Sequence, residues 1–294
     1  MASMRDIKRR KDSITSTSQI TKAMKLVSTV KLQKSKTRAE VSKPYFQCMY
    51  NTVSSILAKA GEINHPYTKG NESGKKAVIL ITSNRGLAGG YNSNIVKLIT
   101  GGDFTKEDTV IYAIGRKGKE ALGRRGYHIQ TDDSEVMNHP LYSDASQIGT
   151  KVLQDFENGA IGEIYLAYTL FKNTVSQIPT LQRILPIDTV LKDSTLEEET
   201  EEQDPYAELT LMNFEPGEEE ILDLLIPKYV KSLLYGGLVQ ALASENGARM
   251  QAMDSATNNA NEMIDNLSLS YNRARQSSIT QEITEIVAGA SAIS

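Results

Sequence analysis

The chain of 294 residues contains no Trp, one Cys and eight Pro, and it has no long run of apolar residues. A single thiol, Cys48, cannot close a disulfide within the chain, which excludes a fold stabilised by disulfides. No uninterrupted apolar stretch approaches the roughly 18 residues that cross a bilayer. Aromatic residues make up only 6% of the sequence, which favours helical packing. We therefore expect an intracellular protein that does not insert into a membrane.

Residues that support catalysis or hold a metal are also scarce. The three histidines, His65, His128 and His139, share no metal-ligand spacing with one another or with Cys48. The sequence contains neither a serine elbow nor a phosphate-binding P-loop. Its carboxylates concentrate in a segment that looks too flexible to hold them for acid–base chemistry. We therefore expect no catalytic residue, no bound metal and no cofactor.

The net charge of −3 conceals a strong separation of charge along the chain. Residues 1–59 carry thirteen Lys or Arg against three Asp or Glu, whereas residues 193–223 carry thirteen Asp or Glu and no base. Blocks of this kind mark solvated faces or interaction surfaces. Nucleic acid is not expected as a partner, because the basic stretch from Lys8 to Lys36 lacks interleaved aromatic residues. A mitochondrial transit peptide within the first thirty residues is an alternative interpretation of the basic end.

Both ends of the chain have the pattern of long helices. Residues 4–58 contain no Gly and one Pro, which predicts a single helix disturbed near Pro44. At the other end Pro227 is the last proline, and a helix is predicted from about residue 216 to the C-terminus. The apolar residues of the first helix fall at helical spacing: Ile20, Met24, Val27, Phe46, Met49, Val53 and Ile56.

The C-terminal segment carries the repeat of a coiled coil. Its mainly apolar and small residues alternate at spacings of four and three: Val239, Ala243, Asn246, Met250, Met253, Thr257, Ala260, Ile264, Leu267, Tyr271 and Ala274. This a/d pattern is typical of a left-handed coiled coil, and the simplest partner is the N-terminal helix lying antiparallel. At about 1.5 Å per residue the helices would be about 80 and 110 Å long, so the longer one should extend past its partner by about 30 Å.

The extension should present a binding surface of its own. Beyond Ala274 the repeat changes phase, and Ile279, Ile283, Ile286 and Val287 form an apolar stripe beyond the reach of the N-terminal helix. An exposed stripe of this kind normally marks a binding surface. We expect the tip to lie in a socket supplied by another protein, with Ile283 and Ile286 among the contact residues.

Between the two helices the sequence predicts an inserted α/β domain. After a loop at 61–74, strands are expected at 77–82, 109–115, 127–131, 163–169 and 181–188, and helices at 90–98, 116–122 and 144–158. The alternation predicts a mostly parallel, Rossmann-like sheet covered on both faces. An acidic loop follows, with a last strand at about 208–214. The expected domains are 1–60, 75–192, 193–214 and 215–294.

A turn rich in glycine after the first strand raises the possibility of a nucleotide site. Gly86, Gly89 and Gly90 do not match the GxGxxG spacing, and the second strand ends at Gly115 without an acid that would bind ribose. A plain tight turn is the simpler interpretation. The basic segment from Gly115 to Gly126 is either an anion site or a solvated helix, and we favour the helix. The alternative function is a nucleotide-binding α/β enzyme that dimerises through a helical arm.

Three segments carry a resemblance to a known family. They are ITKAMKLVSTVKLQKSK at 20–36, SNRGLAGGYN at 83–92, and LASENGARMQAMDSATNNANEMIDNLSLSYNRARQSSITQEITEIVAGASA at 242–292. Together they closely resemble the gamma subunits of F-type ATP synthases, and the resemblance covers the chain in order except for the acidic loop at 193–207. The motif ITKAMK begins where a processed gamma subunit would begin. This position favours a mature, bacterial chain.

The resemblance implies a rotor shaft with no catalytic role of its own. The coiled coil would stand inside a ring of alpha and beta subunits, and the α/β domain would sit with the epsilon subunit on a ring of c subunits. Proton or sodium flow would turn that ring at the cytoplasmic face of the bacterial plasma membrane, and the chain would be peripheral. The resemblance implies that Phe214 and Glu215 face the c ring and the epsilon subunit. It places six shaft residues against beta-subunit loops: Met24, Arg249, Arg275, Gln276, Thr280 and Glu282.

Overall fold

The computed structural model describes residues 4–59, 65–70, 74–187 and 217–293. These residues form two compact units, one within Val30–Ala248 and the other within Met1–Thr29 and Arg249–Ser294. The helices α1 (Met4–Lys59) and α6 (Glu218–Ile293) each contribute to both units. The predicted acidic loop and last strand at 193–214 lie outside the described residues.

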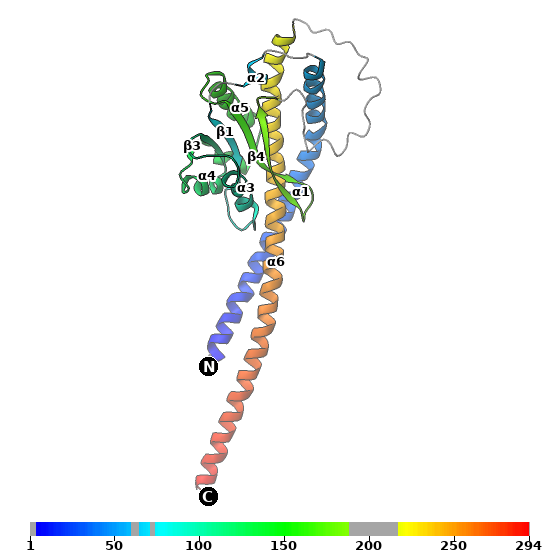
Figure 1. Cartoon of the computed structure of the whole chain (residues 1–294). Coiled ribbons are helices and arrows are strands. Elements are labelled where there is room, and N and C mark those ends of the chain that lie inside the picture. Colours follow the sequence, from blue (N-terminus) through cyan, green and yellow to red (C-terminus); the bar gives the residue numbers. More distant parts are fainter. Residues whose placement is uncertain (1–3, 60–64, 71–73, 188–216, 294) are drawn as a thin grey trace. The chain divides into compact units, whose positions relative to one another are not determined.

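The first unit is built on a five-stranded sheet in the order β3-β2-β1-β4-β5 (Figure 1). The first four strands are parallel, and β5 is antiparallel to β4. The strands are β1 (Lys76–Ile81), β2 (Thr109–Ile114), β3 (His128–Asp132), β4 (Glu163–Phe171) and β5 (Gln177–Leu185). The prediction of a mostly parallel sheet is confirmed, although the strand expected at 181–188 begins four residues earlier.

Helices cover both faces of the sheet, because successive side chains of a buried strand point to opposite sides. In β1, Ile79 and Ile81 belong to one core, whereas Val78 and Leu80 belong to the other. The helices of this unit are α2 (Pro66–Lys69), α3 (Tyr91–Thr100), α4 (Arg116–Gly123) and α5 (Tyr142–Glu157), with a 3₁₀ turn, η1, at Ser134–Asn138. Buried residues of α3 and α4 lie in the second core.

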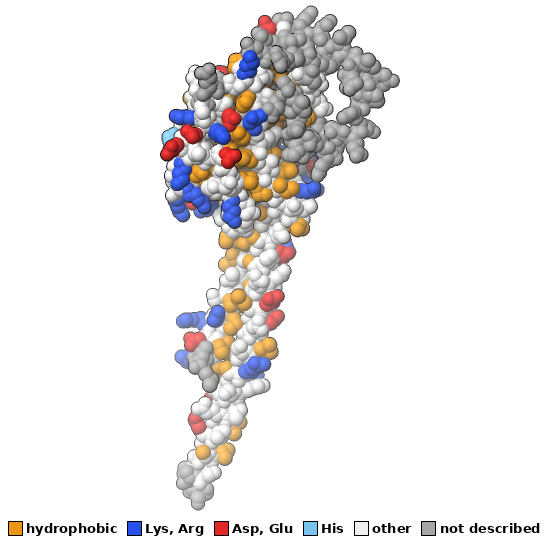
Figure 2. All heavy atoms as spheres, in the orientation of Figure 1, with side chains coloured by type: hydrophobic (Ala, Val, Ile, Leu, Met, Phe, Trp, Pro, Cys, Tyr) orange, Lys and Arg blue, Asp and Glu red, His pale blue; other side chains and the backbone are white. Residues whose placement is uncertain are grey.

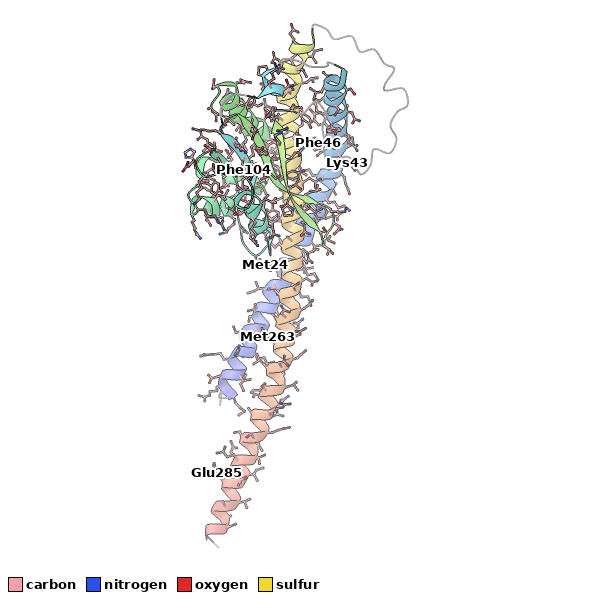
Figure 3. The ribbon with its side chains drawn as sticks, viewed as in Figure 1. Met24, Lys43, Phe46, Phe104, Met263 and Glu285 are labelled. Atoms are coloured by element: carbon pink, nitrogen blue, oxygen red, sulfur yellow. The ribbon has the colours of Figure 1, made fainter. Side chains whose placement is uncertain are left out.

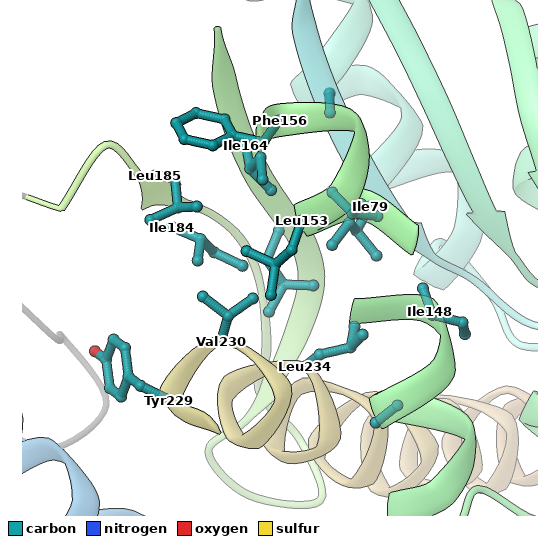
Figure 4. Packing of buried hydrophobic residues seen from close by; sticks show 14 of the residues in the cluster. Ile79, Ile148, Leu153, Phe156, Ile164, Ile184, Leu185, Tyr229, Val230 and Leu234 are labelled. Carbon is teal, nitrogen blue, oxygen red and sulfur yellow. The ribbon is translucent and has the colours of Figure 1, made fainter. Parts of the chain in front are cut away.

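The core on the other face joins α5 to parts of the two long helices. Leu153 of α5 and Val230 and Leu234 of α6 are buried there (Figure 4). Val53 of α1 belongs to the same core. Helix α6 is therefore a structural part of the α/β unit over its first half. Helix α1 continues through Pro44 without interruption, although we expected a disturbance there. Beyond the proline, α1 packs on α6, where the ring centroid of Phe46 lies 6.2 Å from that of Tyr235.

The turn after β2 passes unusually close to the end of β1. Gly115 has a φ of 108°, and a Cβ there would lie 1.9 Å from the carbonyl oxygen of Thr82. L-residues rarely adopt that backbone conformation, so the position demands glycine both for its dihedral angle and for space.

Gly115→Ala is therefore expected to lower the free energy of unfolding by about 3 kcal/mol or more. The matched control is Gly123→Ala, where the nearest atom to a new Cβ would be 4.0 Å away. That change should be neutral, or stabilise α4 by up to about 1 kcal/mol. Urea denaturation of both variants measures the difference, and equal midpoints would contradict the close approach at Gly115.

The second unit is an antiparallel pair of helices. The Thr21 hydroxyl lies 2.7 Å from the Thr257 hydroxyl, and Lys25 Nζ lies 2.6 Å from a carboxylate oxygen of Asp254. In these two pairs the residue numbers add up to 278 and 279, so a higher number on α1 is paired with a lower number on α6. The two helices are therefore antiparallel. All eleven heptad positions predicted from Val239 to Ala274 are buried or half-buried. The predicted seam of α6 is confirmed.

On α1 the seam does not follow the predicted apolar residues. Seven of the ten buried or half-buried positions between residues 4 and 29 follow the alternating spacing of four and three: Ile7, Lys11, Ile14, Ser18, Thr21, Lys25 and Ser28. Ile20 and Val27 are instead 60% and 57% exposed. Their helical spacing identified the helix correctly but not the face that α6 covers.

The pairing ends before α6 does. With a sum of 279, Met4 lies opposite residue 275, so α6 extends beyond the first described residue of α1 by 276–293. That length corresponds to about 27 Å of helix at about 1.5 Å per residue. Every residue of 279–291 is exposed. The predicted extension is confirmed for the described residues.

Candidate functional site

The place where a Rossmann fold binds a nucleotide is filled by α6. Sheets of this topology bind ligands at the carboxyl ends of the strands where the strand order reverses, here between β1 and β4. The hydroxyl of Tyr91 donates to the carbonyl oxygen of Ala241 at 3.2 Å, and that of Ser244 donates to the carbonyl oxygen of Thr169 at 2.9 Å. Gly237 packs so closely on β4 that a Cβ would lie 3.0 Å from a Leu166 methyl. The crevice is therefore occupied by the protein itself.

The backbone amides that would hold a phosphate are also in use. A helix N-terminus binds anions through its first free N–H groups. The first amides of α4 donate instead to the end of β1 and the turn after it: Arg116 N to Asn84 Oδ1 at 3.0 Å, Lys117 N to the Ser83 carbonyl oxygen at 3.0 Å, and Gly118 N to Thr82 Oγ1 at 2.9 Å. These bonds oppose an anion site at the start of α4, the alternative raised for the segment from Gly115 to Gly126.

Basic side chains of α4 are engaged in ion pairs. Lys117 lies 3.1 Å from Glu120 and Lys119 lies 2.5 Å from Asp132. The hydrogen bond from Lys117 lowers the pKa of Glu120, and the hydrogen bonds from Lys119 and Ser134 lower the pKa of Asp132. The segment from Gly115 to Gly126 thus contains a partly solvated helix, two of whose lysines are paired with carboxylates.

The isolated chain is therefore expected to bind neither ATP nor NAD at physiological concentration. Both the crevice and the amides would have to give up intramolecular contacts before a nucleotide could enter. Isothermal titration calorimetry on the full chain should show no heat of binding, with a known nucleotide-binding protein as the positive control. A micromolar site abolished by substitution in the turn at 83–90 would contradict this interpretation.

No group of three His, Cys, Asp or Glu in the described residues could hold a metal ion. His65 has a structural contact on each ring nitrogen: Nδ1 accepts from the Tyr67 amide at 3.2 Å, and Nε2 lies 3.0 Å from Asp223. It caps the short helix α2 and links it to α6.

None of the described helices is both long and apolar enough to cross a membrane.

The structure places the proposed contact residues on the helical unit. Met24 on α1, labelled in Figure 3, is half-buried. Arg249 on α6 is also half-buried. The remaining described ones lie in the exposed stretch of α6 from Arg275 to Ile286. There Ile283 is 56% and Ile286 71% exposed. Gln276, Thr280 and Glu282, which are predicted to contact a partner, are also exposed, and the Thr280 hydroxyl donates to the Gln276 carbonyl oxygen at 2.9 Å. Phe214 and Glu215 lie outside the described residues.

An outward apolar face on α1 was missed by the sequence analysis. Ile20, Leu26, Val27 and Val30 are each between 57% and 61% exposed. Figure 2 shows hydrophobic side chains at the surface of the paired helices, interspersed with charged ones. One signal in the sequence could have revealed this face. Ser18, Thr21 and Ser28 follow the alternating spacing of four and three that a seam requires, and this spacing leaves the large apolar residues of α1 outside the seam.

The described residues thus comprise two long helices, a tip of α6 that extends beyond the described part of α1, and an α/β unit whose nucleotide crevice is filled. These features define a class of protein, namely a helical shaft. The comparisons with known proteins agree with this class. A family model described as ATP synthase matches residues 3–293.

The similar proteins cover nearly the whole chain. The ATP synthase gamma chain of Lachnoclostridium phytofermentans is 67% identical over 100% of both chains. The gamma chain of Acetobacterium woodii, described as sodium ion specific, is 43% identical over 99% of this chain and 98% of its own. Among solved structures, a chain of the Euglena gracilis mitochondrial ATP synthase has a TM-score of 0.67 at 17% identity, covering 99% of this chain and 94% of its own. One from the Tetrahymena thermophila central stalk and c-ring has a TM-score of 0.57 at 22% identity, covering 81% and 99%.

At these identities the solved structures support the fold alone, whereas the sequence matches define the family. The chain belongs to the ATP synthase gamma-chain family. It is a subunit of that enzyme complex.

Proposed function

We propose that this chain transmits the rotation of an ion-driven c ring to the catalytic beta subunits and performs no catalysis itself. The paired helices would turn inside a ring of alpha and beta subunits, with the α/β unit on the c ring beside the epsilon subunit. The complex would lie at the cytoplasmic face of a bacterial plasma membrane, with this chain peripheral. The coupling ion would be a proton or sodium.

One observation carries the proposal, namely the extension of α6 beyond its partner. Within the described residues, Ile279, Ile283, Ile286 and Val287 are between 48% and 71% exposed. Burying one such side chain contributes about 1.5 to 3 kcal/mol, so leaving all four in water would forfeit several kcal/mol. A socket in a partner ring would recover that free energy and hold the end of the shaft.

The outward face of α1 supports a surrounding sleeve. Ile20, Val27 and Val30 are exposed on a helix that also carries many Lys and Arg. Acidic partner loops would be attracted to such a helix, and salt would weaken that attraction. Met24 is half-buried beside this face and would contact a partner loop.

The shaft's polar residues would supply contacts that change as it turns. Arg275 and Gln276 lie at the end of the paired region and are exposed. Arg249 lies nearer the N-terminus of α6. A guanidinium can hold a carboxylate through two parallel hydrogen bonds. Thr280 and Glu282 extend the polar surface along the tip. Phe214 and Glu215 would provide the corresponding contacts at the foot.

The competing enzyme function has little support. A nucleotide-binding enzyme would need an open crevice between β1 and β4, but Tyr91, Gly237 and Ser244 close it. No observation on the described residues favours a substrate site elsewhere.

The proposal is tested by purification of the affinity-tagged chain from native membranes, followed by mass spectrometry. We expect alpha, beta, epsilon and c subunits in fixed ratio and ATP hydrolysis in the purified fraction. An untagged strain is the control for non-specific recovery. Recovery of the chain as a free homodimer with an activity of its own would contradict the proposal.

A further inference from the structure

The seam between α1 and α6 in the helical unit is unusually polar on the α1 side. Thr21 and Ser28 are only 9% and 3% exposed, whereas the larger apolar residues Ile20 and Val27 face outward. Coiled coils normally place their large apolar residues in the seam. Here α1 has such residues within one position of the seam but does not use them to contact α6.

Three side-chain contacts cross this seam on successive turns, and we refer to them as the polar ladder. They are Ser18 Oγ to Asn261 Oδ1 at 2.9 Å, Thr21 Oγ1 to Thr257 Oγ1 at 2.7 Å, and Lys25 Nζ to Asp254 Oδ1 at 2.6 Å. From Ser18 to Thr21 to Lys25 the steps along α1 are three and four residues. From Asn261 to Thr257 to Asp254 the steps along α6 are four and three residues. Met24, labelled in Figure 3, precedes the last of the three.

The ladder fits only one alignment of the helices. If α6 moved by one heptad in either direction, Thr21 would face Ile264 or Met250, and Lys25 would lose its carboxylate partner. The apolar seam residues of α6 cannot enforce the alignment in the same way. Met250 and Met253 are flexible and Ala260 is small, so they would accept a shifted partner.

The ladder adds little to stability. Lys25 and Asp254 are 39% and 47% exposed, and ion pairs at such exposure contribute little because water screens them. A polar contact at a seam position is instead known to specify register at a cost in stability. The choice of Thr and Ser over the neighbouring Ile and Val on α1 follows that pattern.

We propose that Ser18, Thr21 and Lys25, with Asn261, Thr257 and Asp254, are positioning residues that fix the register of the two helices. The register determines which residues of α1 lie level with each turn of α6. Its effect on coupling rests on the proposed shaft function, but the register itself does not.

The test uses disulfide formation in the full-length chain with Cys48→Ser as background. One reporter pair, Ile14→Cys with Ile264→Cys, joins residues that lie opposite each other in the native register. The other pair, Ile14→Cys with Tyr271→Cys, can form a disulfide only if the helices are shifted by one heptad. Two of the three ladder contacts are removed by Thr21→Val, Thr257→Val, Lys25→Met and Asp254→Met, and this fourfold variant is the ladder variant. The matched control keeps the contacts with Thr21→Ser, Thr257→Ser and the exchange Lys25→Asp with Asp254→Lys.

We expect the ratio of native to shifted disulfide to fall about tenfold in the ladder variant and to stay unchanged in the control, as for other polar seam residues. Thermal unfolding should show equal or higher stability in the ladder variant, which a purely structural role would not produce. If the fourfold variant does not fold, the ratio is measured in Lys25→Asp and in the exchanged pair. A ratio that Lys25→Asp leaves unchanged, or that the exchange fails to restore, overturns the proposal.

In the assembled complex, the ladder variant should also pump fewer ions per ATP than the control. The disulfide ratio is measured on the isolated chain, so it stands apart from this result. A lowered ratio in a chain that forms no complex with alpha and beta subunits would contradict the proposed function and leave the register assignment intact.

Discussion

Lys at both Ile283 and Ile286 is expected to lower the yield of assembled complex at least about tenfold without unfolding the chain. The two side chains are 56% and 71% exposed in the chain itself, so their replacement removes little intrachain packing. In an apolar socket, two ammonium groups would have to shed water without partners, at a cost of several kcal/mol. A difference of about 1.4 kcal/mol already changes an equilibrium tenfold.

The matched control is Ser277→Lys with Gln281→Lys, which adds the same charge to the opposite face of the same helix. That variant should assemble at close to normal yield. Size-exclusion chromatography of co-expressed subunits measures the yield, and circular dichroism checks the helix content of the free chain. Normal assembly of Ile283→Lys/Ile286→Lys would contradict the socket.

Ala at both Arg275 and Gln276 is expected to leave assembly intact but to reduce the ions pumped per ATP hydrolysed by several-fold. Both residues are exposed where the pairing with α1 ends, one helical turn before Ile279, the first residue of the apolar stripe. Charge-assisted hydrogen bonds from a guanidinium are worth about 1.5 to 3 kcal/mol, enough to affect how firmly a partner loop follows the shaft. Losing them should let the ring hydrolyse ATP without moving the shaft fully.

The control for this variant is Asn272→Ala with Arg273→Ala, which removes the same two kinds of group from neighbouring exposed positions of α6. Ion pumping into membrane vesicles and ATP hydrolysis are measured in parallel. Pumping per ATP that is normal for Arg275→Ala/Gln276→Ala, or reduced equally in the control, would show that these residues do not hold a partner loop.

The parts of the fold that depend on local pattern were predictable from the sequence. Helix α6 was recognised because nothing after Pro227 can break it and because its heptad positions from Val239 to Ala274 repeat without a gap. The first strands were found because buried parallel strands are short apolar runs. The length of the unpaired tip followed from the difference between the two helices.

The seam of α1 was not predicted, because hydrophobic spacing favoured Ile20 and Val27, while the partner helix covers Thr21 and Ser28. The face of α1 that is buried depends on where α6 packs. This long-range contact, and not the local spacing of apolar residues, decides which residues of α1 are covered. Nor did the sequence show that Tyr91 and Ser244 would close the crevice, since their partners Ala241 and Thr169 lie 150 and 75 residues away in the chain. The antiparallel direction of β5 is a similar long-range feature.

The central claim is that this chain rotates as a rigid shaft, and its one thiol allows a direct measurement. Cys48 is exposed on α1 and is the only cysteine in the sequence, so a gold nanorod can be attached there without adding a new site. The complex would be fixed to glass through its catalytic ring, with Cys48→Ser as the control for labelling. We predict stepwise rotation of the rod in one direction when ATP is added. A rod that stays fixed while the same complexes hydrolyse ATP would contradict the account.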